Sequence, residues 1–119
     1  MTTRITSANI TKSGTSGLSS VAWQAVQTTG FTAVAGNAYP CDTTSAAFTV
    51  TLPASPAAGN VITLVDYAGT WDTNNLTIGR NGQNINGLTV NGIVNTERGA
   101  VNLVYVDATQ GWKIGRAHV

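Results

Sequence analysis

The clearest structural signal in the chain lies in the segment Phe48-Thr49-Val50-Thr51-Leu52. Phe48, Val50 and Leu52 would point to one face of an extended strand and the two threonines to the other, because side chains alternate along a strand. Pro53 follows at once, and proline cannot donate a hydrogen bond to a sheet. The segment therefore predicts a short β-strand with one buried face.

Further strand signals recur at short spacing on both sides of this segment. The segment 61–66 (Val-Ile-Thr-Leu-Val-Asp) is almost continuously apolar, which predicts a central strand covered on both faces or a strand that faces a partner chain. Val61 and Leu64 are therefore candidates for an inter-subunit contact. The remaining strands are expected at 21–26, 31–34 and 76–78, and a terminal hairpin is expected from 101–106 and 112–114. About eight short strands predict an all-β fold, a β-sandwich or jelly-roll-like domain.

The composition supports this fold class and excludes several functions. The 119 residues include 19 Thr, 11 Asn and 13 Gly, but only 9% are charged. Threonine favours strands, whereas asparagine and glycine favour turns. The net charge of +1 argues against an electrostatic nucleic-acid binder, which needs a basic surface to displace counterions from phosphates.

The first 20 residues differ from the rest of the chain. Residues 1–20 carry the isolated aliphatic residues Ile5, Ile10 and Leu18 among Thr, Ser, Gly and the basic side chains of Arg4 and Lys12. No period of 2 or 3.6 residues survives there. We expect an extended N-terminal arm over 1–20, with Arg4, Ile5, Ile10 and Leu18 docking on a neighbouring subunit or capsid, and a single β-sandwich domain over 21–119. The N-terminus has no signal-peptide core and no segment is long enough to cross a membrane, so we expect a cytosolically made protein without membrane contact.

An Asn-Gly pair recurs every five residues, at 81–82, 86–87 and 91–92. Asn-Gly is the strongest two-residue turn signal because both residues tolerate positive φ. We expect very short strands that fold back on themselves. The alternative, a glycine-rich phosphate cradle, needs a helix after the glycines, and no helical period follows.

The residue types that carry catalysis are sparse. His118 is next to the C-terminus, and Cys41 has no histidine placed to activate it. Asp66 and Asp72 flank a loop that could hold calcium or carbohydrate, but turn capping is the stronger interpretation. No spacing typical of a metal site occurs. We therefore expect no enzyme, no catalytic residue, no metal and no cofactor.

The tryptophans are expected mainly in the core, as is usual in a small β domain. Trp112 alternates with Ile114 and should be buried. Trp71 lies in a loop with Tyr67, where an exposed aromatic ring could stack on a sugar or fill a subunit interface. Core burial is favoured for Trp71, and a ligand or inter-subunit surface formed by Tyr67 and Trp71 is the alternative.

Four motifs occur along the chain in a recognisable order. They are T-V-T-L-P at 49–53, the strand 59–66 that begins with Gly and ends with Asp, N-G-Q-N-I-N-G at 81–87, and a closing hairpin from Tyr105 to Trp112. Together they resemble a module of tailed-bacteriophage structural proteins. The module occurs in tail fibres, head fibres and capsid-associated proteins. The resemblance covers about two-thirds of the chain and implies a β-rich, often trimeric virion protein without a catalytic residue.

Chain length separates two functions within this group. A tail fibre normally needs a long shaft, whereas a module with a short arm suits a capsid decoration (cement) protein that binds itself as a homotrimer and the major capsid protein. The alternative is a receptor-binding tail-fibre or tail-tip module that recognises a host glycan. Both hypotheses place the protein in the virion.

Overall fold

A computed structural model describes residues 21–97 and 99–116. The expected arm, with Arg4, Ile5, Ile10 and Leu18, lies outside these residues. The described part is all-β and contains no helix. Its strands are β1 (Ala22–Trp23), β2 (Phe31–Thr32), β3 (Asn37–Cys41), β4 (Phe48–Thr51), β5 (Val61–Asp66), β6 (Leu76–Gly79), β7 (Gly92–Val94), β8 (Ala100–Asp107) and β9 (Gly111–Arg116).

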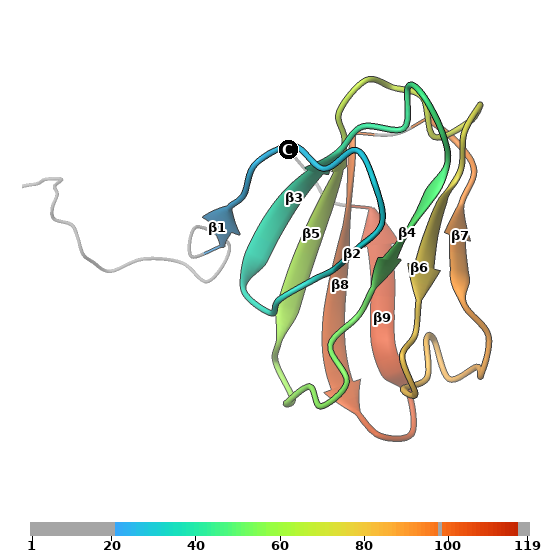
Figure 1. Cartoon of the computed structure of the whole chain (residues 1–119). Helices are drawn as coiled ribbons and strands as arrows, with labels where there is room; N and C mark the ends of the chain where they lie inside the picture. The colour runs from blue at the N-terminus through green and yellow to red at the C-terminus, as the bar shows by residue number, and fades with distance from the viewer. Residues whose placement is uncertain (1–20, 98, 117–119) are drawn as a thin grey trace, which may run out of the picture.

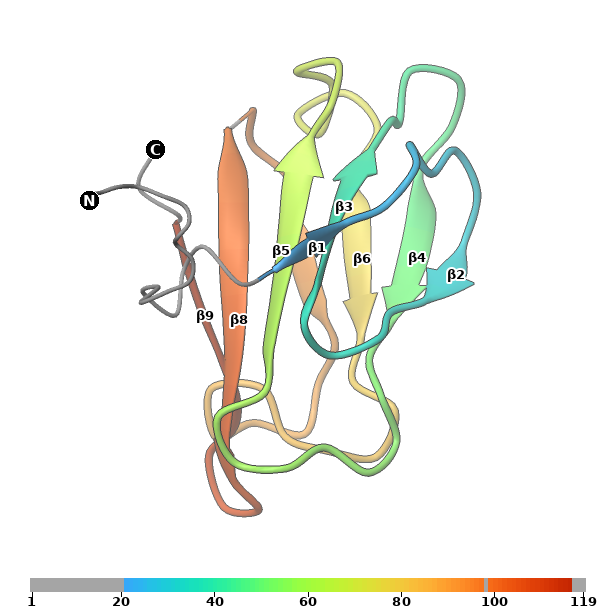
Figure 2. The same cartoon turned by 90° about the vertical axis from the view of Figure 1, so that its left-hand side faces the viewer.

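The strands form two mixed sheets that lie face to face (Figures 1 and 2). One sheet has the order β1-β3-β5-β8-β9 and the other β2-β4-β6-β7. From β1 to β6 the chain alternates between the sheets, so each strand that returns to a sheet runs parallel to its predecessor. A strand of the opposite sheet supplies the crossover that parallel pairing requires. The pairs that involve β7, β8 and β9 are antiparallel.

This pairing differs from the jelly-roll-like order expected from the sequence. A jelly roll is built from antiparallel Greek keys, whereas four of the strand pairs here are parallel. The sequence pattern could not show the difference. Alternation along a strand reports which face is buried, and it is the same for parallel and antiparallel neighbours.

The strand predicted at 48–52 is confirmed as β4. Val50 and Leu52 are fully buried and Phe48 packs against the core, while Thr49 is exposed. β5 lies between β3 and β8, in the interior of its sheet. It alternates between buried and half-buried residues, so its apolar outer face is less covered than its inner face.

Two predicted strands are shorter than expected, and one strand was not predicted. The strand expected over 31–34 is paired only at β2 (Phe31–Thr32). The strand expected over 21–26 is paired only at β1, a two-residue strand. β3 was not predicted, because it contains Pro40, which argues against a strand, and because its apolar run from Ala38 to Cys41 is short. The terminal hairpin is confirmed by β8 and β9, with a register shift between Tyr105 and Asp107.

Both sheets contribute to a common hydrophobic core. Ile62 and Leu103 come from one sheet and Val50 and Leu76 from the other. Trp71 and Trp112 fill the core with their rings, since both are fully buried. The indole N–H of each has no hydrogen-bond partner in the described structure. The general expectation of buried tryptophans is wrong for Trp23, whose side chain is 63% exposed.

Candidate functional site

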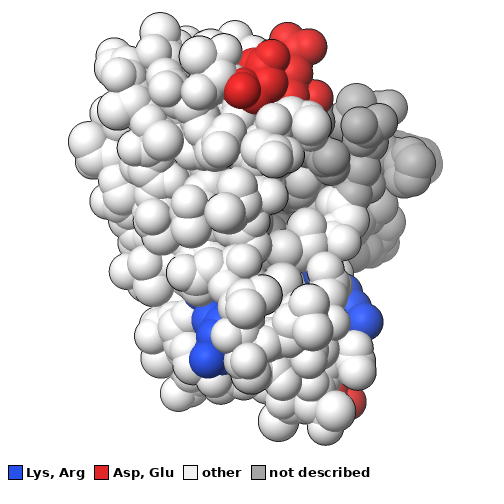
Figure 3. Space-filling model, turned by 90° about the vertical axis from the view of Figure 1, so that its right-hand side faces the viewer, with Lys and Arg blue, Asp and Glu red and all other residues white. Residues whose placement is uncertain are grey.

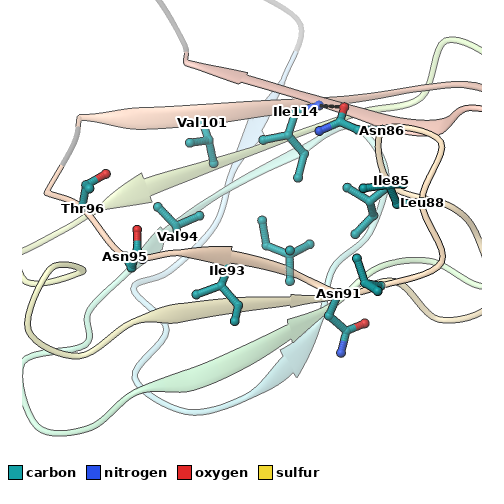
Figure 4. Close-up of a pocket in the computed structure, with 13 residues that line it drawn as sticks. Ile85, Asn86, Leu88, Asn91, Ile93, Val94, Asn95, Thr96, Val101 and Ile114 are labelled. Atoms are coloured by element: carbon teal, nitrogen blue, oxygen red, sulfur yellow. Dashed lines mark hydrogen bonds between the residues drawn. The ribbon is translucent and has the colours of Figure 1, made fainter.

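A groove of about 310 Å³ opens between the two sheets at one side of the molecule. β9 is the last strand of the five-stranded sheet and β7 the last of the four-stranded sheet. Residues from both line the groove, together with the segment that precedes β7 (Figure 4). At this side, therefore, the interior of the fold is accessible from the surface.

The floor of the groove is aliphatic. Ile78 on β6, Val94 on β7 and Val101 on β8 are all buried side chains of the core. Ile85 closes one end, and Ile114 on β9 is half-buried beside it. A ligand in the groove would thus contact the core itself.

The rim carries three exposed aliphatic side chains. Leu88 and Val90 are each 59% exposed and Ile93 is 62% exposed. Asn86, Asn91, Asn95 and Thr96 supply the polar part of the lining, and among the described residues no ionisable side chain contributes to it. The side of the molecule that carries β7 is largely uncharged, with a group of acidic side chains at one end and basic side chains with a smaller acidic patch toward the other (Figure 3). The groove therefore suits an uncharged, partly apolar partner.

The Asn86–Gly87 turn contributes to one wall of the groove, together with Ile85 and Leu88 on either side of it. Asn81 and Asn86 both adopt positive φ, at 50° and 51°, as the turn prediction requires. Ile85 and Leu88, on either side of the Asn86–Gly87 turn, form a two-residue bridge with backbone hydrogen bonds of 3.0 and 2.9 Å. The prediction that the chain folds back at Asn-Gly turns is confirmed at Asn86–Gly87 by this bridge, whereas Asn91-Gly92 forms no such turn: Gly92 begins β7, which pairs with β6.

Backbone hydrogen bonds fix this wall to β9. The N–H of Asn86 donates to the Trp112 carbonyl and the N–H of Gly87 donates to the Gln110 carbonyl, each at 2.8 Å. The Asn86 Oδ1 accepts from the Ile114 N–H at 3.4 Å (Figure 4). Because these hydrogen bonds attach the wall to the sheet, its position does not depend on its own few residues alone. The groove is therefore largely preformed.

The groups with catalytic potential lie away from this groove. Burial, aided by the charge of Asp66, raises the pKa of the Cys41 thiol to about 12. The thiol therefore stays protonated at neutral pH, and a nucleophilic cysteine needs a thiolate. Hydrogen bonds from the Thr44 hydroxyl (2.6 Å) and backbone N–H (3.0 Å) hold the pKa of exposed Asp42 below its usual value.

Asp66 acts as a turn cap, as the sequence favoured. Its carboxylate accepts the backbone N–H groups of Thr70 (3.0 Å) and Trp71 (3.3 Å), and the side chain is buried. Among the residues described, no three His, Cys, Asp or Glu side chains gather to hold a metal ion. The described residues also include no helix that is long and apolar enough to cross a membrane.

The structure separates the four surface candidates of the folded domain. Trp71 and Leu64 are fully buried, so their assignment to a ligand or inter-subunit surface is wrong. Trp71 is held inward by its backbone bond to Asp66, and Leu64 occupies the inner face of β5. Tyr67 is 58% exposed, and Val61 is half-buried on the outer face of β5.

Sequence reasoning missed the residues that form the groove. Leu88, Val90 and Ile93 were read only as short strand positions between turns. The Asn-Gly repeat does carry a signal, because three closely spaced turns leave too few residues for strands that could cover one another.

A comparison with models of known protein families finds no match to the chain, and a comparison with curated proteins finds none either.

Proposed function

We propose that the protein is a non-enzymatic structural subunit of a tailed-phage virion, a homotrimeric decoration protein that binds and stabilises the capsid. In this proposal residues 21–119 form a β-sandwich domain, and residues 1–20 form an arm that docks on the capsid or on a neighbouring subunit. No cofactor or metal takes part. The motif resemblance suggests the virion setting, and the surface described below supports a role in protein contacts.

The observation that carries the proposal is the exposure of large apolar side chains on a nearly uncharged chain. Nine large hydrophobic residues are exposed in the described structure. Trp23, Val26 and Val34 come from the β1–β3 region, Leu88, Val90 and Ile93 lie at the groove, and Val104 and Val106 lie on β8. Scattered apolar residues are normal on a monomer, but grouped ones mark protein contacts.

Such a surface binds by burial and not by charge. A standard protein interface buries roughly 1,600 Å² in total. Three copies that bind together gain further affinity, because each later contact is intramolecular. Since exposed ion pairs contribute little, we expect capsid binding to change little between low and moderate salt.

Immunogold electron microscopy of virions of the encoding phage, with antibody against the recombinant protein, tests the location. Label over the head is expected. Label on the tail alone would replace the decoration role with adsorption, and unlabelled virions would refute the virion assignment.

A truncation tests the arm. A protein lacking residues 1–18 should lose particle binding while its β-type circular dichroism stays unchanged. Thr44→Ala is the control, because it shortens an exposed polar side chain of the folded domain and should leave binding intact. Particle binding by the truncated protein would refute the role of the arm.

The receptor-binding alternative has lost its main residue. Trp71 is buried and cannot stack on a sugar, which leaves Tyr67 as the exposed ring of that loop. Asp72, which follows Trp71, is exposed, and neither Tyr67 nor Asp72 lines the groove. We therefore place this alternative second.

A further inference from the structure

We infer that the groove between β7 and β9 receives residues 5–11 of a neighbouring copy of the chain. The inference rests on the proposed homotrimer and adds the contact that would hold it together. In this inference residues 5–11 of the arm bind a neighbouring subunit and not the capsid. Three properties of the groove and of the segment support it.

The first property is chemical match. Residues 5–11 read Ile-Thr-Ser-Ala-Asn-Ile-Thr and contain no charge, whereas Arg4 and Lys12 flank them directly. The described residues that line the groove carry no charge either. A charged segment would lose hydration without gaining a partner there, which costs free energy. Residues 5–11 form the uncharged part of the arm that carries two isoleucines.

The second property is shape. Isoleucine and threonine favour extended backbone, and alternate residues of an extended segment face opposite ways. Ile5 and Ile10 are separated by five positions, so one faces the floor when the other faces outward. The groove offers aliphatic contacts to both, with Val94 and Val101 in the floor and Leu88 on the rim.

The third property is reach. The described chain starts at Val21, next to β1, whereas the groove lies at β9, the opposite edge of the same sheet. Four strand spacings of about 4.8 Å separate β1 from β9, roughly 19 Å. Residues 12–20 can span about 30 Å when extended. The connection is thus long enough to bring residues 5–11 to a groove at that distance, whether on the same domain or on a neighbouring one.

The position of the two edges favours a neighbour over the same chain. To enter its own groove, the arm would have to cross the whole sheet and turn around β9. If the β1 edge of one copy lies beside the groove of the next, the arm enters that groove directly. Head-to-tail contacts of this kind close into rings, and a trimer is such a ring.

Disulfide trapping in the full chain tests this contact. One chain carries Ile10→Cys, and a second, differently tagged chain carries Ile93→Cys; the two are co-expressed and then oxidised. Cys41 is buried, and burial keeps its thiol protonated, so it does not compete. We expect a covalent dimer that contains both tags, because Ile93 lies on the rim. As a matched control, Thr44→Cys replaces Ile93→Cys; Thr44 is exposed and is not part of the groove lining, so no such dimer is expected.

The outcomes separate this inference from the proposed function. A dimer with both tags for Ile93→Cys and not for Thr44→Cys supports the inference. A trimer by sedimentation that gives no covalent dimer overturns the inference and leaves the homotrimer standing. A chain carrying both Ile10→Cys and Ile93→Cys that closes only on itself overturns the neighbour contact. A monomer by sedimentation overturns both the homotrimer and the inference, whereas head labelling of virions tests capsid decoration independently.

Discussion

Replacing Gly111 by alanine tests the contact that joins the groove wall to β9. Gly111 begins β9 with a φ of +70°. A Cβ atom at this position would overlap the backbone carbonyl of Asn84 and come within 2.8 Å of the Asn84 Cα. The overlapping group is backbone and cannot rotate away, so the Asn84 segment has to move.

The cost follows from the bonds that this movement breaks. The Asn84 carbonyl accepts the backbone N–H of Trp112 at 2.8 Å, and Trp112 is fully buried. A buried donor left without a partner costs about 1–3 kcal/mol. The left-handed backbone adds about 1–2 kcal/mol for any residue with a Cβ. We therefore expect Gly111→Ala to lower the free energy of unfolding by about 2–5 kcal/mol.

Gly69→Ala is a matched control because its φ of +68° is nearly the same. The nearest atom to its added Cβ is the Glu97 carboxylate oxygen at 2.9 Å, the end of a flexible, exposed side chain that can rotate away. Only the backbone strain of about 1–2 kcal/mol remains. Urea unfolding at one fixed protein concentration, followed by tryptophan fluorescence, measures both variants. Equal losses in the two variants would refute the tight packing of Gly111 on Asn84.

Three further predictions concern the core and the loop that follows β5. The free energy of unfolding should fall as the pH rises from about 9 to about 12. In this range the Cys41 thiol is ionised in the unfolded chain but still protonated in the folded chain, so the folded state binds one more proton. Each pH unit in this range lowers the free energy of unfolding by up to about 1.4 kcal/mol. Cys41→Ala should remove this contribution when unfolding in urea is measured at several pH values. The same pH dependence in Cys41→Ala and the wild type would contradict the prediction. Trp71→Ala should cost about 3–5 kcal/mol, whereas Tyr67→Ala at an exposed position should change thermal unfolding by less than about 0.5 kcal/mol; similar losses would contradict the burial of Trp71. Asp66→Ala should cost about 2–5 kcal/mol, because two backbone N–H groups, those of Thr70 and Trp71, lose their acceptor; wild-type unfolding in urea would exclude the cap.

The local pattern of residues was enough to predict several elements. The alternation in 48–52 predicted β4 and its buried face, and the Asn-Gly pairs predicted turns whose asparagines at 81 and 86 adopt positive φ. The terminal hairpin was predicted from two apolar runs separated by a polar turn. Each of these depends on neighbours within a few residues, which a sequence displays directly.

The candidate site could be predicted only in part. The uncharged character of the groove follows from the composition, and the aliphatic residues between the turns were visible. The burial of Trp71 was the favoured prediction, whereas the exposure of Trp23 was not predicted, because Trp23 lies in the apolar run 21–26. Their positions depend on which distant strands cover them.

The sequence by itself thus determined an all-β chain, its turns, its low charge and the inner face of its clearest strand, since these follow from side-chain chemistry and local backbone preference. Only the tertiary structure decided that the chain alternates between two sheets with parallel neighbours, and that β7 and β9 leave a groove between them. Side-chain alternation is the same for any strand partner. The partner is chosen by how the whole chain buries its apolar surface.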